Sequence, residues 1–182
     1  MKKRLILDNS LTRIILERIA LQITENHGDM NNCAIIGMQP RGILLARKLL
    51  EIVSRISGNK NILYGELDST FYRDDIRQGD KMLVPNTIKI DFLIENKKII
   101  IVDDVLYTGR SVRSSLNALA DFGRPLKIEL MALIDRKFNR ELPIQPDYIG
   151  EEVDTRTNDR VEVMWTENKS TPEVWIITEI EN

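Results

Sequence analysis

The apolar residues of this chain fall into short blocks whose spacing predicts buried strands alternating with amphipathic helices. The clearest block is Ile99–Val102, four consecutive β-branched residues that are apolar enough for a strand buried on both faces. A helix face follows at i, i+4, i+7, i+8 spacing, and a glycine and a proline end that helix: Val112, Leu116, Leu119, Ala120, Gly123 and Pro125.

The same alternation extends over the rest of the chain. Helix patterns begin at Leu11, after the N-cap candidates Asp8–Ser10, and again at Ile43. Further strands are predicted at Leu5–Leu7, Cys33–Ile36, Asn61–Leu67, Lys127–Ile134, Ile144–Val153, Arg160–Trp165 and Val174–Ile180. Strands that alternate with helices predict an α/β fold with an open parallel sheet, whose ligand site lies at the carboxyl edge of the strands.

Two carboxylates and a small hydroxyl-bearing turn stand between the central strand and its helix. Asp103 and Asp104 come where the strand is expected to end, and Tyr107–Ser111 form the turn. The first N–H groups of a helix lack internal partners and bind anions, and Thr108 and Ser111 add hydroxyl donors. The acids would repel a phosphate, but they can accept hydrogen bonds from sugar hydroxyls or help to hold a divalent cation. This pattern describes a site for a ribose 5-phosphate, although two solvated strand-end acids are the alternative.

The run Val102–Ser111 resembles the phosphoribosyl pyrophosphate (PRPP) signature of type I phosphoribosyltransferases. Its particular residues are similar to those of the bifunctional pyrimidine operon regulator / uracil phosphoribosyltransferase family. An Asp-Asp pair with a Thr-Gly pair alone is a weak signal. Other segments match in the family's order between about Leu7 and Gly150, so the resemblance covers most of the chain: Met30–Cys33, Tyr72–Asp75, Gly123–Pro125, Arg140–Ile144 and Asp147–Gly150.

The resemblance implies a single phosphoribosyltransferase domain over residues 1–182. Its open parallel sheet would be flanked by helices, with a flexible β-arm at about residues 68–90 and a small hood contributed by about residues 135–165. The implied reaction converts uracil and PRPP to UMP and pyrophosphate, with Mg²⁺ bound together with PRPP.

The resemblance also assigns roles to the central motif. Asp103 and Asp104 would be catalytic, holding the ribose hydroxyls and supporting Mg²⁺ indirectly through PRPP or water. The 5-phosphate would be held by backbone N–H groups and hydroxyls of the residues that follow: Val105, Leu106, Tyr107, Thr108, Gly109, Arg110 and Ser111.

Pyrophosphate binding is assigned to two further segments. In the loop after the Cys33–Ile36 strand, Arg41 and Gly42 match the family motif, although Gln39 and Pro40 stand where the family usually has a basic residue and a threonine. A plain turn is the alternative for this loop.

The second of these segments is the β-arm, a charged stretch without clear periodicity. In the family such an arm closes over PRPP and excludes water, and Arg73 matches a catalytic residue expected to reach the pyrophosphate. An ordinary exposed hairpin is the alternative.

Base recognition is implied for the end of the predicted strand at Lys127–Ile134. Backbone groups near Ile134, Asp135 and Arg136 would read the uracil edge, and the Arg136 side chain would make a direct contact. A solvated loop arginine is the alternative for Arg136.

Composition narrows the class of protein without naming the reaction. The chain has 182 residues, 42% hydrophobic and 30% charged, as in an ordinary soluble globular domain. One cysteine, Cys33, excludes an internal disulfide and suits the cytoplasm, and no apolar run reaches membrane-spanning length. The single histidine, His27, is expected to be a surface turn residue rather than a catalytic one.

The charge distribution bears on a second function, UMP-dependent binding of messenger RNA to attenuate transcription of pyrimidine genes. The net charge is −2; residues 151–182 hold nine acidic and three basic residues, which leaves +4 for residues 1–150. Relatives that regulate bind RNA through a basic face, on which Arg18 and Arg140 keep their charge here. Five positions lack the basic or histidine side chains expected on that face: Leu21, Asn26, Asn139, Gln145 and Glu151. We therefore expect RNA binding to be weak or absent.

Two further alternatives stay open. A transferase of the same fold could act on another nucleobase, because base selection runs mainly through backbone groups. In the first helix, Leu11, Ile14, Ile15, Ile19 and Ile23 are predicted to face the core. Leu16, Ala20 and Leu21 lie beyond that stripe, so a homodimer is expected and a higher oligomer is open.

Overall fold

The computed structural model describes residues 1–68, 88–155, 159–165 and 170–178. Its helices are α1 (Asn9–His27), α2 (Gly42–Ser57) and α3 (Arg110–Ala120). Its strands are β1 (Lys2–Leu7), β2 (Cys33–Met38), β3 (Leu63–Leu67), β4 (Lys98–Leu106), β5 (Lys127–Lys137), β6 (Tyr148–Asp154), β7 (Asp159–Met164) and β8 (Glu173–Thr178).

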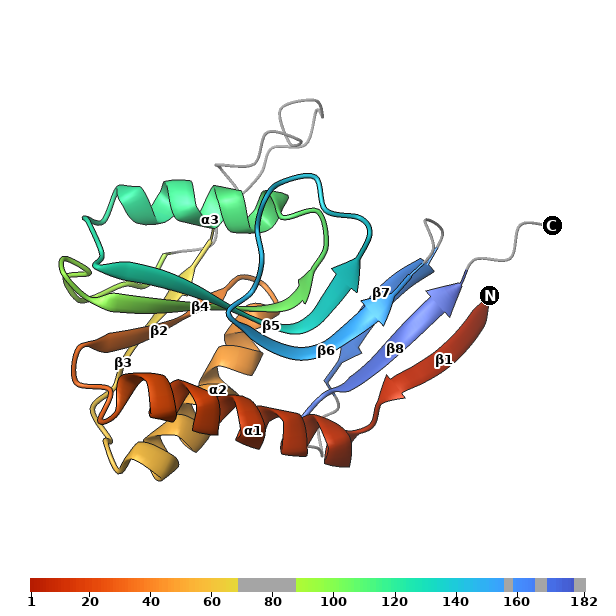
Figure 1. The fold of residues 1–182 in the computed structure, drawn as a ribbon, viewed down its shortest axis with the longest axis horizontal. Coiled ribbons are helices and arrows are strands. Elements are labelled where there is room, and N and C mark those ends of the chain that lie inside the picture. Colours follow the sequence, from red (N-terminus) through yellow and green to blue (C-terminus); the bar gives the residue numbers. More distant parts are fainter. Residues whose placement is uncertain (69–87, 156–158, 166–169, 179–182) are drawn as a thin grey trace.

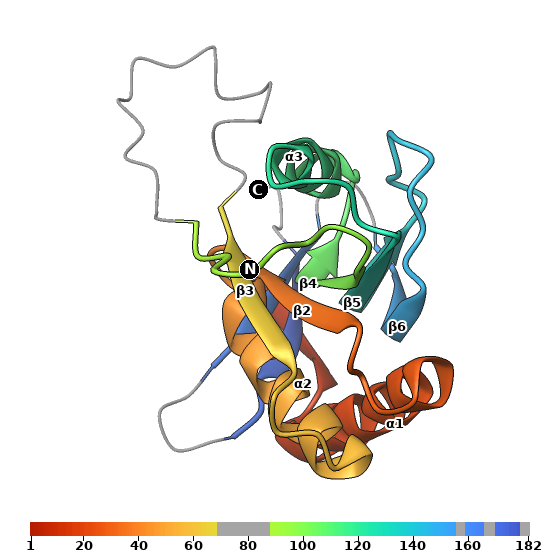
Figure 2. The same ribbon diagram turned by 90° about the vertical axis from the view of Figure 1, so that its left-hand side faces the viewer.

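A parallel sheet in the order β3-β2-β4-β5-β6 forms the centre of the molecule. Helix α3 covers one face of this sheet, and α1 and α2 cover the other (Figures 1 and 2). The predicted open α/β sheet is therefore confirmed. Because all five strands run the same way, their carboxyl ends meet at one edge, where ligands bind in such folds.

Strand β4 is buried on both faces, as its run of β-branched residues predicts. Ile100 and Val102 belong to the core beneath α1 and α2, whereas Ile99 and Ile101 belong to the core beneath α3. Each of these four side chains is fully buried. The alternation follows from the two-residue period of a strand, and it places β4 at the centre of both cores.

A smaller antiparallel sheet, in the order β1-β8-β7, lies beside β6 (Figure 1). Lys2 pairs with Thr178, so this sheet joins the two ends of the described chain. The hood expected at about residues 135–165 contains only β7 of these three strands. The long sequence separation between β1 and β8 explains why local patterns did not reveal the pairing.

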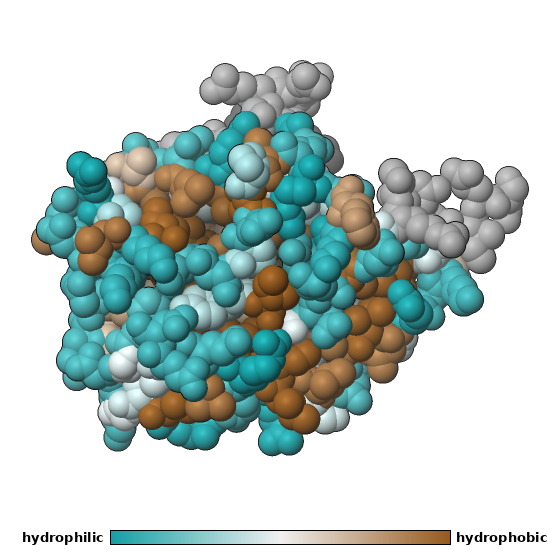
Figure 3. All heavy atoms as spheres, viewed as in Figure 1, coloured by the Kyte–Doolittle hydropathy of each residue, from teal (hydrophilic) through white to brown (hydrophobic). Residues whose placement is uncertain are grey.

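Helix α1 is buried on a face rotated from the predicted one. Leu16 and Ala20 are fully buried, whereas Leu11 and Ile14 are 44% and 59% exposed. Apolar residues occur nearly all round this helix, so periodicity alone does not determine which stripe meets the sheet. In Figure 3 apolar side chains lie along the lower edge of the molecule, where Figure 1 places α1, with polar side chains between them.

Among the described residues, no helix combines the length and the apolar character needed to cross a bilayer.

Candidate functional site

The turn between β4 and α3 forms a cavity at the carboxyl edge of the sheet. Its volume is about 270 Å³, and it is lined by Asp103, residues 105–112 and Glu141. Gly109 has a φ of +91°, and a Cβ there would lie 3.2 Å from Ile144 Cδ1. This backbone conformation and close packing require glycine. All the residues predicted to hold a 5-phosphate are therefore brought together around one cavity.

Helix α3 begins at this cavity, and its N-cap residue, Gly109, has no side chain to cap it. Thr108 Oγ1 accepts a hydrogen bond of 3.3 Å from the Arg110 N–H, beside the start of the helix. By contrast, α1 starts away from this turn and is capped by Asp8, which accepts from the Leu11 N–H at 2.8 Å. Uncapped N–H groups at the start of a helix attract anions, so the turn favours a phosphate.

The twin acids lie within β4 rather than after it. The strand continues to Leu106, which pairs with Asp135 of β5, so the predicted strand end was wrong by several residues. Ladder pairing with β5 extends beyond the apolar run that marked the strand in the sequence. Asp103 lines the cavity beside α3, whereas Asp104 lies close enough to Arg41 of the β2–α2 loop to interact with its charge.

Asp104 has a buried oxygen that the described protein groups leave without a hydrogen bond. Asp103 Oδ1 accepts from the Asp104 N–H and Asp104 Oδ1 from the Val105 N–H, each at 2.9 Å. Asp104 is 8% exposed, and its Oδ2 is buried without a hydrogen-bond partner among the described residues. An unpartnered buried carboxylate oxygen is costly, so this one is suited to accept hydrogen bonds from a ligand.

Burial makes both carboxylates harder to ionise. Burial and the charge of Asp104 raise the pKa of Asp103 well above its usual value. Burial also raises the pKa of Asp104, while the positive charge of Arg41 acts in the opposite direction. Perturbed pKa values of this kind are typical of functional sites, because a ligand must supply the stabilisation that the protein withholds.

The loop between β2 and α2 brings Arg41 to the same edge. A Cβ on Gly42 would overlap the Val102 carbonyl oxygen, so only glycine lets the start of α2 press against β4. Helix α2 also lacks a side-chain cap, and the Gln39–Pro40 peptide bond is cis. The structure thus brings Arg41 and Gly42 together with the twin acids, in keeping with the predicted grouping.

The end of β5 lies next to the end of β4. Val105 pairs with Ile134 and Leu106 with Asp135, so the predicted base-binding residues adjoin the phosphate turn. Ile134 is fully buried and Asp135 is 8% exposed. A second cavity, of about 540 Å³, opens beside Asp135 and Arg136 and extends under the loop between β5 and β6.

Arg136 is buried rather than a solvated loop residue, with 7% of its surface exposed. Its Nε donates to Thr155 Oγ1 at 3.0 Å, and its Nη2 donates to the Asp159 carbonyl oxygen at 2.9 Å. The guanidinium lies 3.9 Å from the centroid of the Tyr107 ring. Burial lowers the pKa of Arg136 because it disfavours the charged form, although Tyr107 and Asp159 act to raise the pKa.

Arg140 and Glu141 lie in the matched segment Arg140–Ile144, and Arg140 also on the expected RNA face, but sequence reasoning gave neither a role at this site. Arg140 donates to the Tyr107 carbonyl oxygen and pairs with Asp135. Glu141 Oε2 accepts from Arg110 Nε at 2.6 Å, and the Glu141 N–H donates to the Thr108 carbonyl oxygen at 3.1 Å. Their contacts with Tyr107, Thr108 and Arg110 give no local signal, because they join residues 31 to 33 positions apart.

Arg73 lies outside the described residues, as does most of the predicted arm. Near the end of the arm, Lys89 pairs with Glu66 of β3 through two backbone hydrogen bonds of 2.9 Å.

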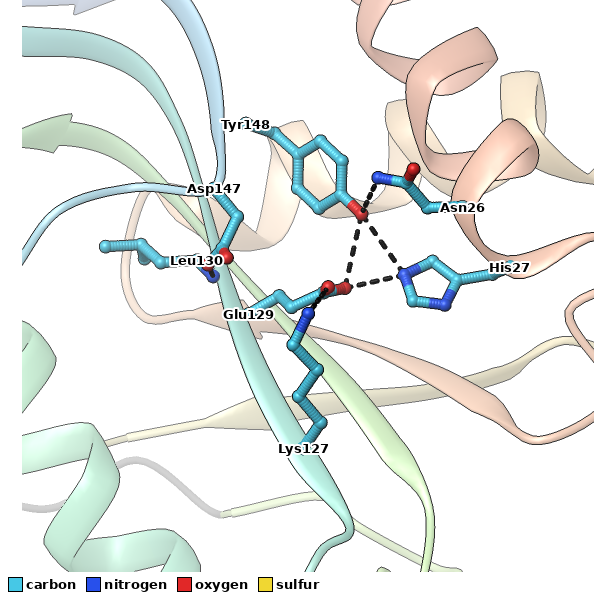
Figure 4. Close-up of polar contacts among 7 residues, drawn as sticks. All are labelled: Asn26, His27, Lys127, Glu129, Leu130, Asp147 and Tyr148. Atoms are coloured by element: carbon cyan, nitrogen blue, oxygen red, sulfur yellow. Dashed lines mark hydrogen bonds and ion pairs between the residues drawn. The ribbon is translucent and has the colours of Figure 1, made fainter.

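His27 lies far from this edge of the sheet, in a partly buried polar cluster that we call the His27 cluster: Asn26, His27, Lys127, Glu129 and Tyr148 (Figure 4). The imidazole is 2% exposed, so the expectation of a surface turn residue was wrong. Glu129 is the third residue of β5, at the amino end of the strand opposite to the phosphate turn. The cluster therefore holds α1 against the sheet and lies apart from the candidate site.

Comparisons with known proteins agree with this geometry. A protein-family model described as "Phosphoribosyl transferase domain" matches residues 5–165. "Bifunctional protein PyrR" of Elusimicrobium minutum (strain Pei191) is 46% identical over 161 residues, which is 88% of this chain and 89% of that protein. The protein of the same name from Bacillus cereus (strain AH820) is 44% identical over 166 residues, 89% of this chain and 90% of that protein.

Solved structures share the fold at low sequence identity. A hypoxanthine-guanine phosphoribosyltransferase from Bacillus anthracis superposes with a TM-score of 0.66 at 15% identity, covering 83% of this chain and 84% of that one. A hypoxanthine-guanine-xanthine phosphoribosyltransferase superposes with a TM-score of 0.67 at 17% identity, covering 97% and 94%. These similarities establish the fold and leave the nucleobase open.

Proposed function

Because this chain belongs to the type I phosphoribosyltransferase family, among the relatives named bifunctional protein PyrR, we propose that it converts uracil and PRPP to UMP and pyrophosphate. One observation carries the proposal: the uncapped start of α3 lies beside two acids, one of which has a buried oxygen without a protein partner among the described residues. An anion site next to hydrogen-bond acceptors suits a phosphate joined to a sugar diol.

The 5-phosphate would bind in the cavity of the β4–α3 turn. Backbone N–H groups at the start of α3 and the hydroxyls of Thr108 and Ser111 would donate to it. The ribose hydroxyls would donate to the carboxylates of Asp103 and Asp104. This division supports PRPP as substrate, because the acids avoid the phosphate and accept from neutral hydroxyls.

The pyrophosphate would lie between the β2–α2 loop and the β-arm, bound by Arg41, the backbone at Gly42, and Arg73. In the reaction the C1–O bond of PRPP breaks, its electron pair leaves with the pyrophosphate, and a ring nitrogen of uracil forms the new bond to C1. The nitrogen gives its proton to the carboxylate of Asp104, the residue we assign near it. Positive charge develops on the ribose ring, so neighbouring carboxylates lower the barrier electrostatically.

Mg²⁺ is the metal implied for this reaction, and the acids fit it in one specific manner. Among the described residues, no group of three or more possible metal ligands lies together, so the protein by itself offers no complete cage. Mg²⁺ is commonly held by one or two carboxylates together with substrate oxygens. Asp103 and Asp104 would therefore support it through PRPP or water, and the ion would neutralise the leaving pyrophosphate.

Uracil would lie at the end of β5, where backbone groups of Ile134 and Asp135 read its polar edge and Arg136 borders it. Their position next to the phosphate turn supports this assignment, because the base must reach C1 of a sugar held there. A cytoplasmic location accompanies the proposal, supported by the single buried cysteine, Cys33.

Regulation by RNA binding is the second function to weigh, since the relatives are named bifunctional. The two basic residues kept on the expected RNA face have intramolecular partners. Arg18 donates to the carbonyl oxygens of Ile149 and Gly150, each at 2.8 Å, and Arg140 pairs with Asp135 and Tyr107. Guanidinium groups engaged in this way contribute less to phosphate binding, which supports weak or absent RNA attenuation.

A homodimer is part of the proposal. Helix α1 exposes Leu11, Ile14 and Leu21 to between 44% and 59%, on one face of the helix. Exposed apolar side chains gathered on one helix favour association with a second copy, and sedimentation analysis would measure the assembly.

An activity screen tests the proposed reaction. Purified protein with Mg²⁺ and PRPP is incubated separately with uracil, hypoxanthine and guanine, and nucleotide and pyrophosphate are quantified. We expect UMP from uracil alone, and no turnover by the Asp103→Asn, Asp104→Asn double variant. Turnover of a purine alone would reject uracil as the substrate.

A further inference from the structure

Tyr107 is contacted by two arginines that come from the far side of the site. The Arg136 guanidinium lies on the face of its ring, 3.9 Å from the centroid, and Arg140 donates to its backbone carbonyl oxygen. Tyr107 itself is 38% exposed and lies in the turn that lines the phosphate cavity. The two contacts constrain both the side chain and the main chain of one residue in that turn.

Both arginines are themselves anchored. Arg136 donates to Thr155 after the end of β6 and to the carbonyl oxygen of Asp159 at the start of β7. Arg140 pairs with Asp135, and the two side chains are 22% and 11% exposed. An arginine with its planar group fixed on one side is pre-organised to hold a partner on the other.

The same segment follows the phosphate turn further along. The Glu141 N–H donates to the Thr108 carbonyl oxygen, and the Glu141 carboxylate accepts from Arg110. Figures 1 and 2 show the connection between β5 and β6 rising beside α3. Tyr107, Thr108 and Arg110 thus each have a partner from the segment 136–141, which constrains the turn.

Resting on the proposed function, we propose that Arg136 and Arg140 are positioning residues that act through Tyr107 to hold the phosphate turn in the conformation that binds PRPP. Their contribution is geometric, through ring stacking and a carbonyl hydrogen bond, and their positive charge alone does not supply it. Pre-organisation of a binding loop lowers the entropy lost when the ligand binds, so losing it weakens binding.

Charge-conserving variants separate geometry from charge. Arg136→Lys keeps the positive charge but loses the planar group, and Arg140→Lys cannot bridge Tyr107 and Asp135 as a fork. PRPP binding is measured by calorimetry with Mg²⁺, and steady-state kinetics are measured with uracil. The control is Arg55→Lys, at an exposed arginine that pairs with Glu17 between α1 and α2.

We expect each clamp variant, Arg136→Lys or Arg140→Lys, to weaken PRPP binding and to raise the KM for PRPP by about fivefold to tenfold, as loss of a desolvated cation–π or charged hydrogen bond does. The value of kcat at saturating PRPP should change less than the KM, and the control should match wild type. Tyr107→Leu and Arg136→Lys remove the same contact. The double variant should therefore bind PRPP no more weakly than whichever of the two single variants binds it less tightly.

Arg140 is the partly exposed member, so Arg140→Lys keeps the test open if Arg136→Lys does not fold. Wild-type affinity for PRPP in a folded clamp variant would overturn the proposal, as would additive effects in the double variant. A fall in kcat with an unchanged KM would also overturn it. Failure of the wild-type protein to bind PRPP would instead contradict the proposed function, on which the positioning role of Arg136 and Arg140 rests.

Discussion

His27 Nε2 lies 2.6 Å from Glu129 Oε2, with both side chains withdrawn from solvent where the end of α1 meets the amino end of β5 (Figure 4). The Tyr148 hydroxyl lies 3.2 Å from the same carboxylate oxygen and accepts from Asn26 Nδ2 at 3.1 Å. Lys127 pairs with the other oxygen of Glu129. One buried carboxylate therefore joins α1, β5 and β6.

The His27 cluster predicts a pH dependence of stability. Burial by itself would raise the pKa of Glu129, but hydrogen bonds and charges from Lys127 and His27 outweigh burial and lower the pKa. A carboxylate with a lowered pKa in the folded state stabilises above its unfolded pKa, about 4.3 for glutamate, and loses that contribution as the pH falls through the lower folded value. Glu129→Gln should reduce the free energy of unfolding at pH 7 by about 2–3 kcal/mol.

Urea unfolding at pH 7 and below pH 4 checks this prediction. The loss should shrink as the pH falls through the lowered pKa of Glu129, because wild type then also protonates this carboxylate. Glu51→Gln is the control, since Glu51 is exposed and pairs with Lys48 one turn earlier. An equal loss at both pH values would argue that Glu129 stabilises by packing rather than by charge.

Asp104 predicts the opposite relation between charge and stability. Burial raises its pKa, so the folded state disfavours the ionised form and stability falls as the pH rises through its titration. Asp104→Asn should therefore raise the Tm at pH 7.5 by about 2–4 °C for each kcal/mol recovered, while lowering kcat/KM by roughly 10²-fold or more.

Thermal scans and kinetics on the same samples measure both effects. The increase in Tm should vanish at acidic pH, where Asp104 is protonated in wild type. If Asp104→Asn lowers both the Tm and the activity at pH 7.5, Asp104 stabilises the fold rather than binding a ligand.

Gly42 predicts a defect that is steric in origin. A Cβ would overlap the Val102 carbonyl oxygen, so Gly42→Ala must move α2 away from β4. We expect a loss of about 1–3 kcal/mol of stability, as for other overpacked sites, and a higher KM for PRPP as Arg41 moves with the helix. A Cβ on Gly58 meets no atom within 4 Å, so Gly58→Ala should leave the KM unchanged.

RNA binding provides a prediction in which substitutions add a function. Wild type should show no UMP-dependent retention of a pyrimidine-leader RNA in a filter-binding assay. Adding basic residues with Gln145→Arg and Glu151→Lys should raise the affinity for RNA. The slope of the logarithm of the binding constant against the logarithm of the salt concentration should steepen by about 0.7 for each further phosphate that the protein neutralises. Tight UMP-dependent binding by wild type would show that the basic positions already present are sufficient.

Sequence patterns identified the parts of the site that are continuous in the chain. The apolar run Ile99–Val102 predicted β4, and the following acids and hydroxyls predicted the phosphate turn, because both signals are local. Patterns did not reveal that β4 extends to Leu106, since its last residues are paired by β5 rather than marked by apolar side chains.

Contacts between distant segments could not be read in this way. The His27–Glu129 pair spans 102 residues, and the Arg140–Tyr107 bond spans 33. Histidine in a polar stretch and arginine after a strand are typical of exposed positions, so the burial of His27 and the partial burial of Arg140 follow only from tertiary packing. For the same reason the buried face of α1 depended on what packs against it.

The position of a bound nucleotide tests the central claim most directly. A crystal structure with UMP should place its phosphate against the start of α3, between Thr108 and Ser111, with the ribose hydroxyls donating to Asp103 and Asp104. A ribose phosphate bound elsewhere on the protein, with this turn unoccupied, would contradict the account.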